Sequence, residues 1–152
     1  MQIVLYQPEI PQNTGNIARL CAVTKSELHL IEPFGFFWDD QRLKRAGLDY
    51  WVLANIQRHL NFQTYLEKNP SQRLFYATTK AKLIYTDIHF TDRDTFVFGP
   101  ETRGLPSEIL ERSPEQNIKI PMSEQTRSLN LANSVSIILY EALRQQNFPG
   151  LT

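Results

Sequence analysis

The chain has 152 residues, 41% of them hydrophobic and 21% charged, which suits one compact domain, residues 1–152, with a buried core. The 16 Lys and Arg residues balance the 16 Asp and Glu residues, so a strongly basic surface over the whole protein is excluded, although a local basic patch is not. No apolar run is long enough to span a membrane and no signal-peptide pattern opens the chain, so we expect a cytoplasmic protein without membrane contacts.

Short apolar segments alternate with helical ones along the chain. Strands are expected over residues 3–6, 28–31, 73–78, 95–98 and 118–120. Helices are expected over residues 13–25, 39–46, 61–67 and 107–110, the first three beginning with caps at Asn13, Asp39 and Asn61. Residues 80–93 show only weak periodicity. The alternation predicts an α/β fold with a mostly parallel sheet covered by helices and joined by right-handed crossovers.

The last expected helix, over residues 128–146, is apolar on more than one face. One apolar stripe would satisfy packing on one sheet. A helix that is apolar so widely needs further cover, either from its own chain or from a second copy of the protein.

Two of the apolar segments break abruptly into polar loops. The first breaks at Gly99 and Pro100, and the second breaks at Pro121. Either loop alone is consistent with an ordinary turn. The backbone groups of such loops have no ladder partners, and the carboxyl ends of neighbouring strands are where α/β sheets bind ligands. We therefore expect the two loops to line one pocket.

A third segment completes a pattern with these two loops. The three segments together closely resemble the three signature motifs of the SPOUT superfamily of S-adenosylmethionine-dependent RNA methyltransferases. They are residues 8–22 (PEIPQNTGNIARLCA), 96–106 (FVFGPETRGLP) and 118–134 (IKIPMSEQTRSLNLANS). The likeness runs from Ile3 to Gly150 and includes IEP at 31–33, WDD at 38–40 and RAGLDY at 45–50. It is strongest to the small tRNA (cytidine/uridine) 2'-O-methyltransferases of the TrmL type. The resemblance implies a trefoil knot at the C-terminal end and a homodimer formed across the last helix.

The loops suit a nucleoside better than a polyphosphate. No G-x-G-x-x-G follows the first strand, and Leu105 and Pro106 stand where a Walker A loop needs Lys and Ser or Thr. Backbone groups, hydroxyls and apolar side chains suit adenine and a methionine chain. The resemblance implies that S-adenosylmethionine is bound by Ala77, Thr78, Gly99, Glu101, Gly104, Ile120, Met122, Ser128 and Leu129.

Methyl transfer to a ribose hydroxyl is an in-line displacement that needs positioning and a group that assists loss of the hydroxyl proton. The resemblance implies an essential role for Arg19. A guanidinium with a pKa above about 12 is a poor base, so we expect Arg19 to grip phosphate and stabilise the developing alkoxide, with the proton passing to phosphate or water.

Other motif residues complete the expected catalytic set. Asn13 and Asn130 are expected either to orient the ribose or to cap helices. Glu101 is expected either to face the sulfonium of the cofactor or to pair with Arg103. Ser128 is expected to cap the last helix and to contact the cofactor or the hydroxyl. With Arg19, the candidate catalytic residues are therefore Asn13, Glu101, Ser128 and Asn130.

RNA contacts are expected from one arginine in each motif and from residues 42–45. That short basic run is either a solvated helix face or a phosphate contact. Tyr140 either stacks on a base or packs in the core or at an interface. The candidate RNA-binding residues are Arg19, Arg42, Lys44, Arg45, Arg103, Arg127 and Tyr140.

The remaining reactive side chains are expected to be structural. Cys21 lies among apolar residues, as a small buried hydrophobe does, and no cluster of metal ligands is visible. The three histidines, at positions 29, 59 and 89, lie outside the motifs. The leading hypothesis is 2'-O-methylation of the wobble nucleotide in a tRNA anticodon loop. The alternatives are methylation of another tRNA or rRNA site and a non-catalytic RNA-binding factor.

Overall fold

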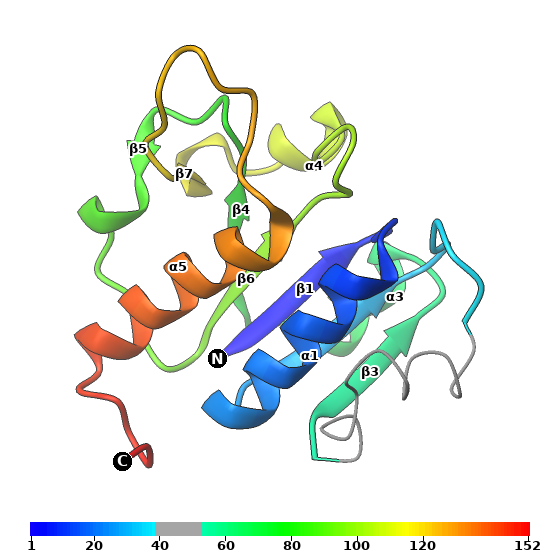
Figure 1. Cartoon of the computed structure of the whole chain (residues 1–152), viewed down its shortest axis with the longest axis horizontal. Helices are drawn as coiled ribbons and strands as arrows, with labels where there is room; N and C mark the ends of the chain where they lie inside the picture. Colours follow the sequence, from blue (N-terminus) through cyan, green and yellow to red (C-terminus); the bar gives the residue numbers. More distant parts are fainter. Residues whose placement is uncertain (39–52) are drawn as a thin grey trace.

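A parallel sheet of seven strands runs through the part of the chain that this computed structural model describes, residues 1–38 and 53–152 (Figure 1). The strand order is β3-β2-β1-β6-β4-β7-β5, and every neighbouring pair is parallel. The strands are β1 (Gln2–Tyr6), β2 (Glu27–Ile31), β3 (Asn55–His59), β4 (Arg73–Ala77), β5 (Leu83–Ile84), β6 (Asp94–Phe98) and β7 (Asn117–Lys119).

The five predicted strands are confirmed to within a residue at each end, and two further strands were missed. β3 is an edge strand of sequence NIQRH with a single buried residue, so it has no apolar run to reveal it. β5 has only two residues and lies in the weakly periodic stretch 80–93. By contrast, β6 lies inside the sheet and is buried at all five positions.

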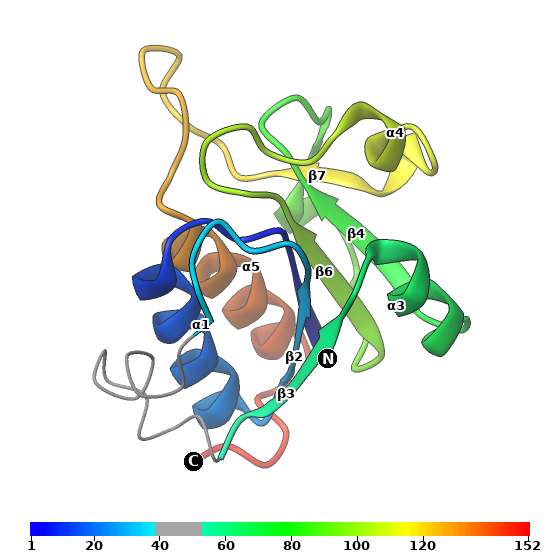
Figure 2. The same cartoon turned by 90° about the vertical axis from the view of Figure 1, so that its right-hand side faces the viewer.

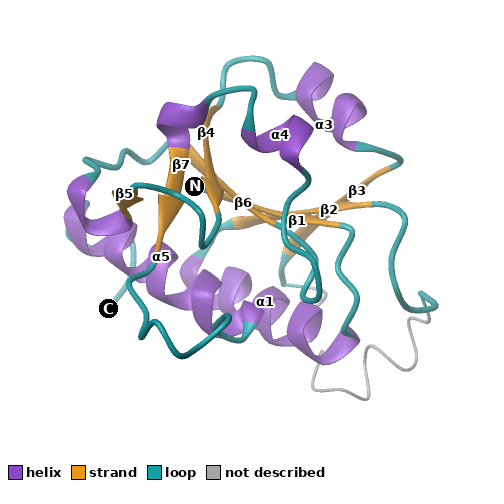
Figure 3. Ribbon diagram, turned by 90° about the horizontal axis from the view of Figure 1, so that it is seen from above, coloured by secondary structure: helices purple, strands orange, loops and turns teal. Residues whose placement is uncertain are grey.

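Helices cover both faces of the sheet (Figure 3). α1 (Pro11–Thr24) and α5 (Leu131–Gln145) lie side by side on one face. α3 (Phe62–Lys68) and α4 (Ser107–Leu110) lie on the other. Two short 3-10 turns, η2 (Tyr85–Asp87) and η3 (Pro114–Gln116), belong to the connections. None of the described helices is both long and apolar enough to cross a membrane.

Two predicted helix starts are wrong and two are confirmed, one of them that of α4 at Ser107. α1 begins at Pro11, whose ring suits a first helical turn, so Asn13 lies inside the helix and does not cap it. α5 begins at Leu131 and is capped by Asn130, so Ser128 lies in the preceding loop and does not cap it. Asn61 caps α3 as predicted, accepting a hydrogen bond from the Thr64 amide at 2.8 Å. The helix predicted over 39–46 lies outside the described residues.

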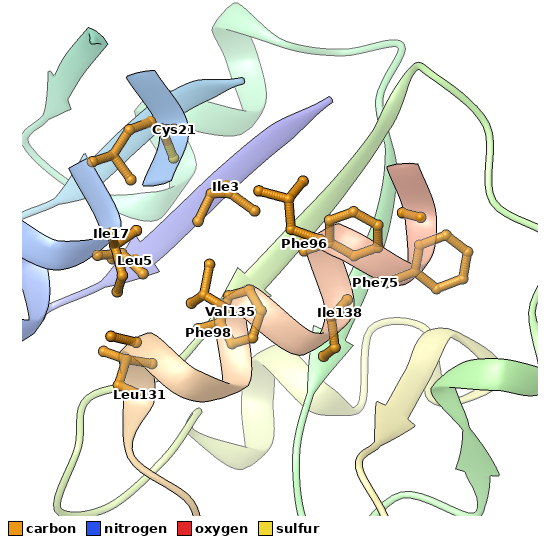
Figure 4. Packing of buried hydrophobic residues seen from close by; sticks show 14 of the residues in the cluster. Ile3, Leu5, Ile17, Cys21, Phe75, Phe96, Phe98, Leu131, Val135 and Ile138 are labelled. Carbon is orange, nitrogen blue, oxygen red and sulfur yellow. The ribbon is translucent and has the colours of Figure 1, made fainter. Parts of the chain in front are cut away.

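The larger core lies between the sheet and the pair formed by α1 and α5 (Figure 4). Val135 and Ile138 of α5 point toward Phe96 and Phe98 of the central strand β6. Cys21 of α1 is fully buried, and burial raises its thiol pKa to about 12, which confirms its role as a small hydrophobe. Most apolar residues of α5 are therefore covered by their own chain. The trefoil knot remains a prediction from the resemblance.

A buried pair of histidines lies in the sheet beneath α3. His29 Nδ1 and His59 Nε2 are 3.0 Å apart, and the His29 Nε2 atom is 3.4 Å from the Glu27 carboxylate. Both rings make edge contacts with Tyr65 of α3. Burial, followed by the neighbouring His59, lowers the pKa of His29 to about 4. Both rings are therefore structural, as predicted, and neither lines the site described below.

We expect this pair to make the protein sensitive to mild acid. An unfolded histidine titrates near 6.5, so between pH 6.5 and about 4 the unfolded chain binds a proton that folded His29 does not bind. The free energy of unfolding should fall by up to about 3 kcal/mol as the pH drops through this window. Urea unfolding near neutral pH and at about pH 5 measures the change. His29→Gln should flatten the dependence, whereas exposed His89→Gln should leave it intact; an equal slope in all three proteins would contradict the assignment.

Candidate active site

A cavity of about 540 Å³ opens at the carboxyl ends of β4, β6 and β7, beside the first turn of α5. Its walls are the two loops predicted to form one pocket, together with the end of β4 and the first turn of α1. All nine predicted cofactor-binding residues line it: Ala77, Thr78, Gly99, Glu101, Gly104, Ile120, Met122, Ser128 and Leu129. The structure therefore brings together residues that are far apart in the sequence.

The loop after β6 closes on itself through its two glycines. The Gly104 amide donates to the Pro100 carbonyl at 2.9 Å, and Gly104 has a φ of +69°. A Cβ atom at Gly99 would lie 2.3 Å from backbone atoms of both Gly104 and Leu105. Only glycine permits so close an approach, and buried Leu105 anchors the end of the loop in the core beneath α4.

The cavity has the size and lining of a site for a nucleoside-like cofactor. Its volume falls within the range of about 300–1,000 Å³ that is usual for small-molecule sites. Strand ends supply backbone amides and carbonyls, Thr78 and Ser128 supply hydroxyls, and Ile120, Leu129 and Ile138 supply apolar surface. This mixture fits an adenine ring and an aliphatic methionine chain.

The Glu101 carboxylate accepts hydrogen bonds from the residues at the start of α1. Its oxygens accept hydrogen bonds from the Glu9 amide at 2.8 Å, the Ile10 amide at 3.2 Å and the Asn13 side-chain amide at 3.0 Å. The N-cap residue Ile10 has no side-chain cap of its own, so Glu101 provides one from a distant loop and answers the positive end of the helix dipole. The predicted pairing with Arg103 is wrong, since the Arg103 guanidinium donates to the Gln7 amide oxygen at 2.8 Å.

The Glu9 carboxylate, at the start of α1, in turn accepts hydrogen bonds from the loop after β6. It accepts from the Thr102 amide at 3.0 Å and from the Thr102 hydroxyl at 2.8 Å. Two carboxylates thus tie the start of α1 to the loop after β6, each accepting from the backbone of the other segment. Sequence reasoning missed Glu9 and Thr102, because only their neighbours carry a recognisable glycine or proline signal.

Two asparagines extend this connection to α5. Asn130 Nδ2 donates to Asn13 Oδ1 at 2.9 Å, while Asn130 Oδ1 accepts from the Asn133 amide at 3.2 Å and so caps α5. Asn13 is 6% exposed and also donates to Glu101. A continuous chain of hydrogen bonds therefore joins one residue from each of the three motifs.

The structure places the candidate RNA-binding residues in three groups. Arg103 and Arg127 line the cavity, whereas Arg19 and Tyr140 do not. Arg19 follows Asn13 by six residues in α1, which is about 9 Å along the axis and about 240° around it. Consistent with this rotation, Asn13 is buried and Arg19 is exposed. The predicted contacts at Arg42, Lys44 and Arg45 lie outside the described residues.

A parallel α/β sheet whose three motif segments meet at one cofactor-sized cavity is the architecture expected of a methyltransferase of the SPOUT kind. The sequence model of the SpoU rRNA Methylase family matches residues 1–140, and the chain belongs to that family. Among similar proteins, the tRNA (cytidine(34)-2'-O)-methyltransferase of Escherichia coli (strain K12) is 54% identical over 151 residues, which cover 99% of this chain and 96% of that protein.

Solved structures agree with this assignment. One, from work on the 2-OH methylation of C/U34 on tRNA, is 45% identical and superposes with a TM-score of 0.90 over 96% of this chain and 95% of that one. The fold is shared more distantly with the SpoU methyltransferase AviRb from Streptomyces viridochromogenes in complex with AdoMet, which is 23% identical. That superposition has a TM-score of 0.82 and covers 97% of this chain and 58% of the other.

Proposed function

We infer that this protein is an S-adenosylmethionine-dependent tRNA methyltransferase that modifies the ribose 2'-hydroxyl of the wobble cytidine or uridine, position 34 of the anticodon loop. The identity of 54% to a tRNA (cytidine(34)-2'-O)-methyltransferase, over nearly the whole of both chains, carries this conclusion. An unpaired loop nucleotide exposes its sugar edge, as this reaction requires. The partner is therefore tRNA, and we propose that the single domain works in the cytoplasm, where tRNA is modified.

We propose that the residues lining the cavity hold the cofactor. The ends of β4 and β6 supply backbone groups at Thr78 and Gly99, and Ile120 and Leu129 supply apolar surface. When bound, S-adenosylmethionine supplies a methyl group attached to a positively charged sulfur. Ser128 lies in the loop before α5, where its hydroxyl is available to the cofactor or to the ribose.

Asn13, Asn130 and Glu101 are proposed as positioning residues. Their side chains form hydrogen bonds with one another and with the backbone at helix termini, so they hold the walls of the cavity in fixed relative positions. Such rigidity matters because an in-line displacement loses rate steeply when the reacting atoms are misplaced.

Arg19 is proposed to act in the cavity of a second subunit. Within one chain it is exposed on α1 and does not line the cavity, yet methyl transfer needs a group that stabilises the developing alkoxide. A homodimer in which Arg19 of the partner subunit faces the cavity satisfies both facts. Exposed apolar residues near the α1–α5 face support such a dimer: Val23 is 49% exposed, Tyr140 45% and Phe148 39%.

Incubation with labelled S-adenosylmethionine and total tRNA tests the function directly. We expect label in a ribose-methylated pyrimidine at position 34, seen as one phosphodiester that resists alkali because its blocked 2'-oxygen cannot attack the neighbouring phosphate. A matched tRNA transcript carrying 2'-deoxycytidine at this position should accept no label. Label on a base, at another tRNA position or only in added ribosomal RNA would refute the proposed substrate.

A further inference from the structure

The loop after β2 presents an unusual group of aromatic side chains. The rings of Phe34 and Phe36 are stacked with centroids 5.6 Å apart, and the Trp38 ring lies 5.3 Å from that of Phe34. These three residues are partly buried, whereas Phe37 is 95% exposed. No other large hydrophobic residue in the described ranges, 1–38 and 53–152, is as exposed. Within its described residues 32–38, the loop therefore presents one aromatic side chain to solvent.

The loop around Phe37 is held in place by several contacts. The guanidinium of Arg58 lies over the rings of Phe34 and Trp38, at 5.4 Å and 4.6 Å, and forms an ion pair with Glu32 at 2.8 Å. The Gly35 amide donates to the Pro8 carbonyl at 3.0 Å. Because the neighbouring residues are fixed in this way, exposure of the Phe37 ring does not follow from a loose loop.

The same loop adjoins the wall of the cavity. A Cβ atom at Gly35 would lie 2.8 Å from Glu9 Cα, and the Glu9 carboxylate binds Thr102 in the cavity wall. Because all strands are parallel, the loops after β2 and β6 rise from the same end of the sheet (Figure 2). An RNA whose ribose is placed at the cavity therefore lies at the end of the sheet that also carries the loop of Phe37.

We propose that Phe37 is a stacking site for an unpaired base of the RNA substrate, an inference that rests on the proposed function. A flat ring can stack on any base, and an anticodon loop offers several unpaired ones. The adjacent charges of Glu32 and Arg58 neutralise each other, so the loop suits a base face better than a phosphate. The exposed apolar residues assigned to the subunit interface lie elsewhere, at Val23 and Tyr140 of the helices α1 and α5 and at Phe148 beyond α5.

The experiment compares Phe37→Ala, Phe37→Leu and Phe37→Tyr with the wild type in binding and methylating an RNA hairpin that has the sequence of an anticodon stem and loop. Phe37→Ala should raise KM and Kd for the hairpin about tenfold, a change within the range for loss of one stacked base. Phe37→Tyr should restore affinity and Phe37→Leu should not, because stacking needs a flat ring. Affinity for S-adenosylmethionine should not change in any variant.

Salt dependence separates stacking from charge. The loss of RNA affinity in Phe37→Ala should be the same at low and high salt. Arg103→Ala should instead reduce the slope of log Kd against log salt by about one, the value for one lost phosphate contact. Leu53→Ala is the matched control, because Leu53 is 72% exposed but lies just before the amino end of β3, whereas Phe37 follows the carboxyl end of the parallel strand β2.

The binding and methylation results together show whether the stacking site or the proposed function is wrong. If the wild type methylates the hairpin and Phe37→Ala binds equally well, the stacking site is refuted and the function stands. If Phe37→Ala weakens binding but no protein methylates RNA, the stacking site stands and the function fails. A change in sedimentation coefficient without a change in RNA affinity would assign Phe37 to a protein interface and overturn the proposal.

Discussion

Arg19→Ala should lower the rate of methyl transfer at least about a hundredfold, the scale expected when a positioned charge is lost from a transition state. Affinity for S-adenosylmethionine should stay nearly constant, because Arg19 does not line the cavity of its own chain. Arg19→Lys should restore little, since an ammonium lacks the two-pronged geometry that grips phosphate and alkoxide together. Single-turnover methylation of tRNA, with calorimetry for the cofactor, measures both quantities. Turnover of Arg19→Ala at the wild-type rate would remove Arg19 from the mechanism.

Mixing two impaired variants, Arg19→Ala and Gly99→Ala, tests where Arg19 acts. In the proposed homodimer, one Arg19→Ala chain paired with one Gly99→Ala chain leaves one cavity with an intact wall and an intact partner arginine. If the site is shared, equal amounts of the two proteins, refolded together, should recover about a quarter of wild-type activity, because half of the dimers are mixed and each has one complete site of two. No recovery would place Arg19 and its cavity in the same chain.

Gly99→Ala should weaken cofactor binding about a hundredfold. The added Cβ would lie 2.3 Å from backbone atoms of Gly104 and Leu105, which cannot turn aside as a flexible side chain can. Overpacking of this kind costs up to about 3 kcal/mol, equivalent to about two orders of magnitude in affinity if the loop must open to relieve it. Calorimetry with S-adenosylmethionine measures the loss of affinity. An unchanged affinity would contradict the proposal that this loop binds the cofactor.

Two other glycines provide matched controls. An added Cβ at Gly104 meets no atom within 4 Å, so Gly104→Ala introduces only the strain of a φ of +69°, about 1 kcal/mol, and should weaken binding tenfold at most. Gly150 has a similar φ of +71° but lies outside the cavity. Gly150→Ala should therefore lower stability slightly without changing the affinity for the cofactor.

The sequence predicted the parts of the fold that local signals determine. The buried central strands have apolar runs, and the loops that line the cavity follow glycine and proline breaks, so both were found. β3 was missed because an edge strand with one buried residue carries a polar sequence. Of the two expected asparagine caps, the one at Asn13 is wrong and the one at Asn130 is confirmed. Pro11 starts α1 before Asn13, whereas Asn130 both caps α5 and contacts Asn13.

Long-range contacts explain most of what the sequence could not reveal. The bond between Glu9 and Thr102 joins residues 93 positions apart, and nothing local distinguishes either side chain from a solvated one. The exposure of Phe37 was equally hidden. Four of the five residues from 34 to 38 are aromatic, and only the packed structure shows which of those rings remains outside.

The hydrogen-bond chain from Glu101 through Asn13 to Asn130 also has a consequence for how the protein gains its stability. Its links span 88 and 117 positions, so the walls of the cavity meet only after the last helix has docked on the first. Contacts of such sequence separation form late and slowly in folding. A ligand held by these walls binds only the completed fold, and its binding energy therefore stabilises the whole domain, by about 2.7 kcal/mol at a hundred times its Kd. Bound methyl donor therefore adds to the free energy of unfolding of the whole domain in addition to its part in the reaction.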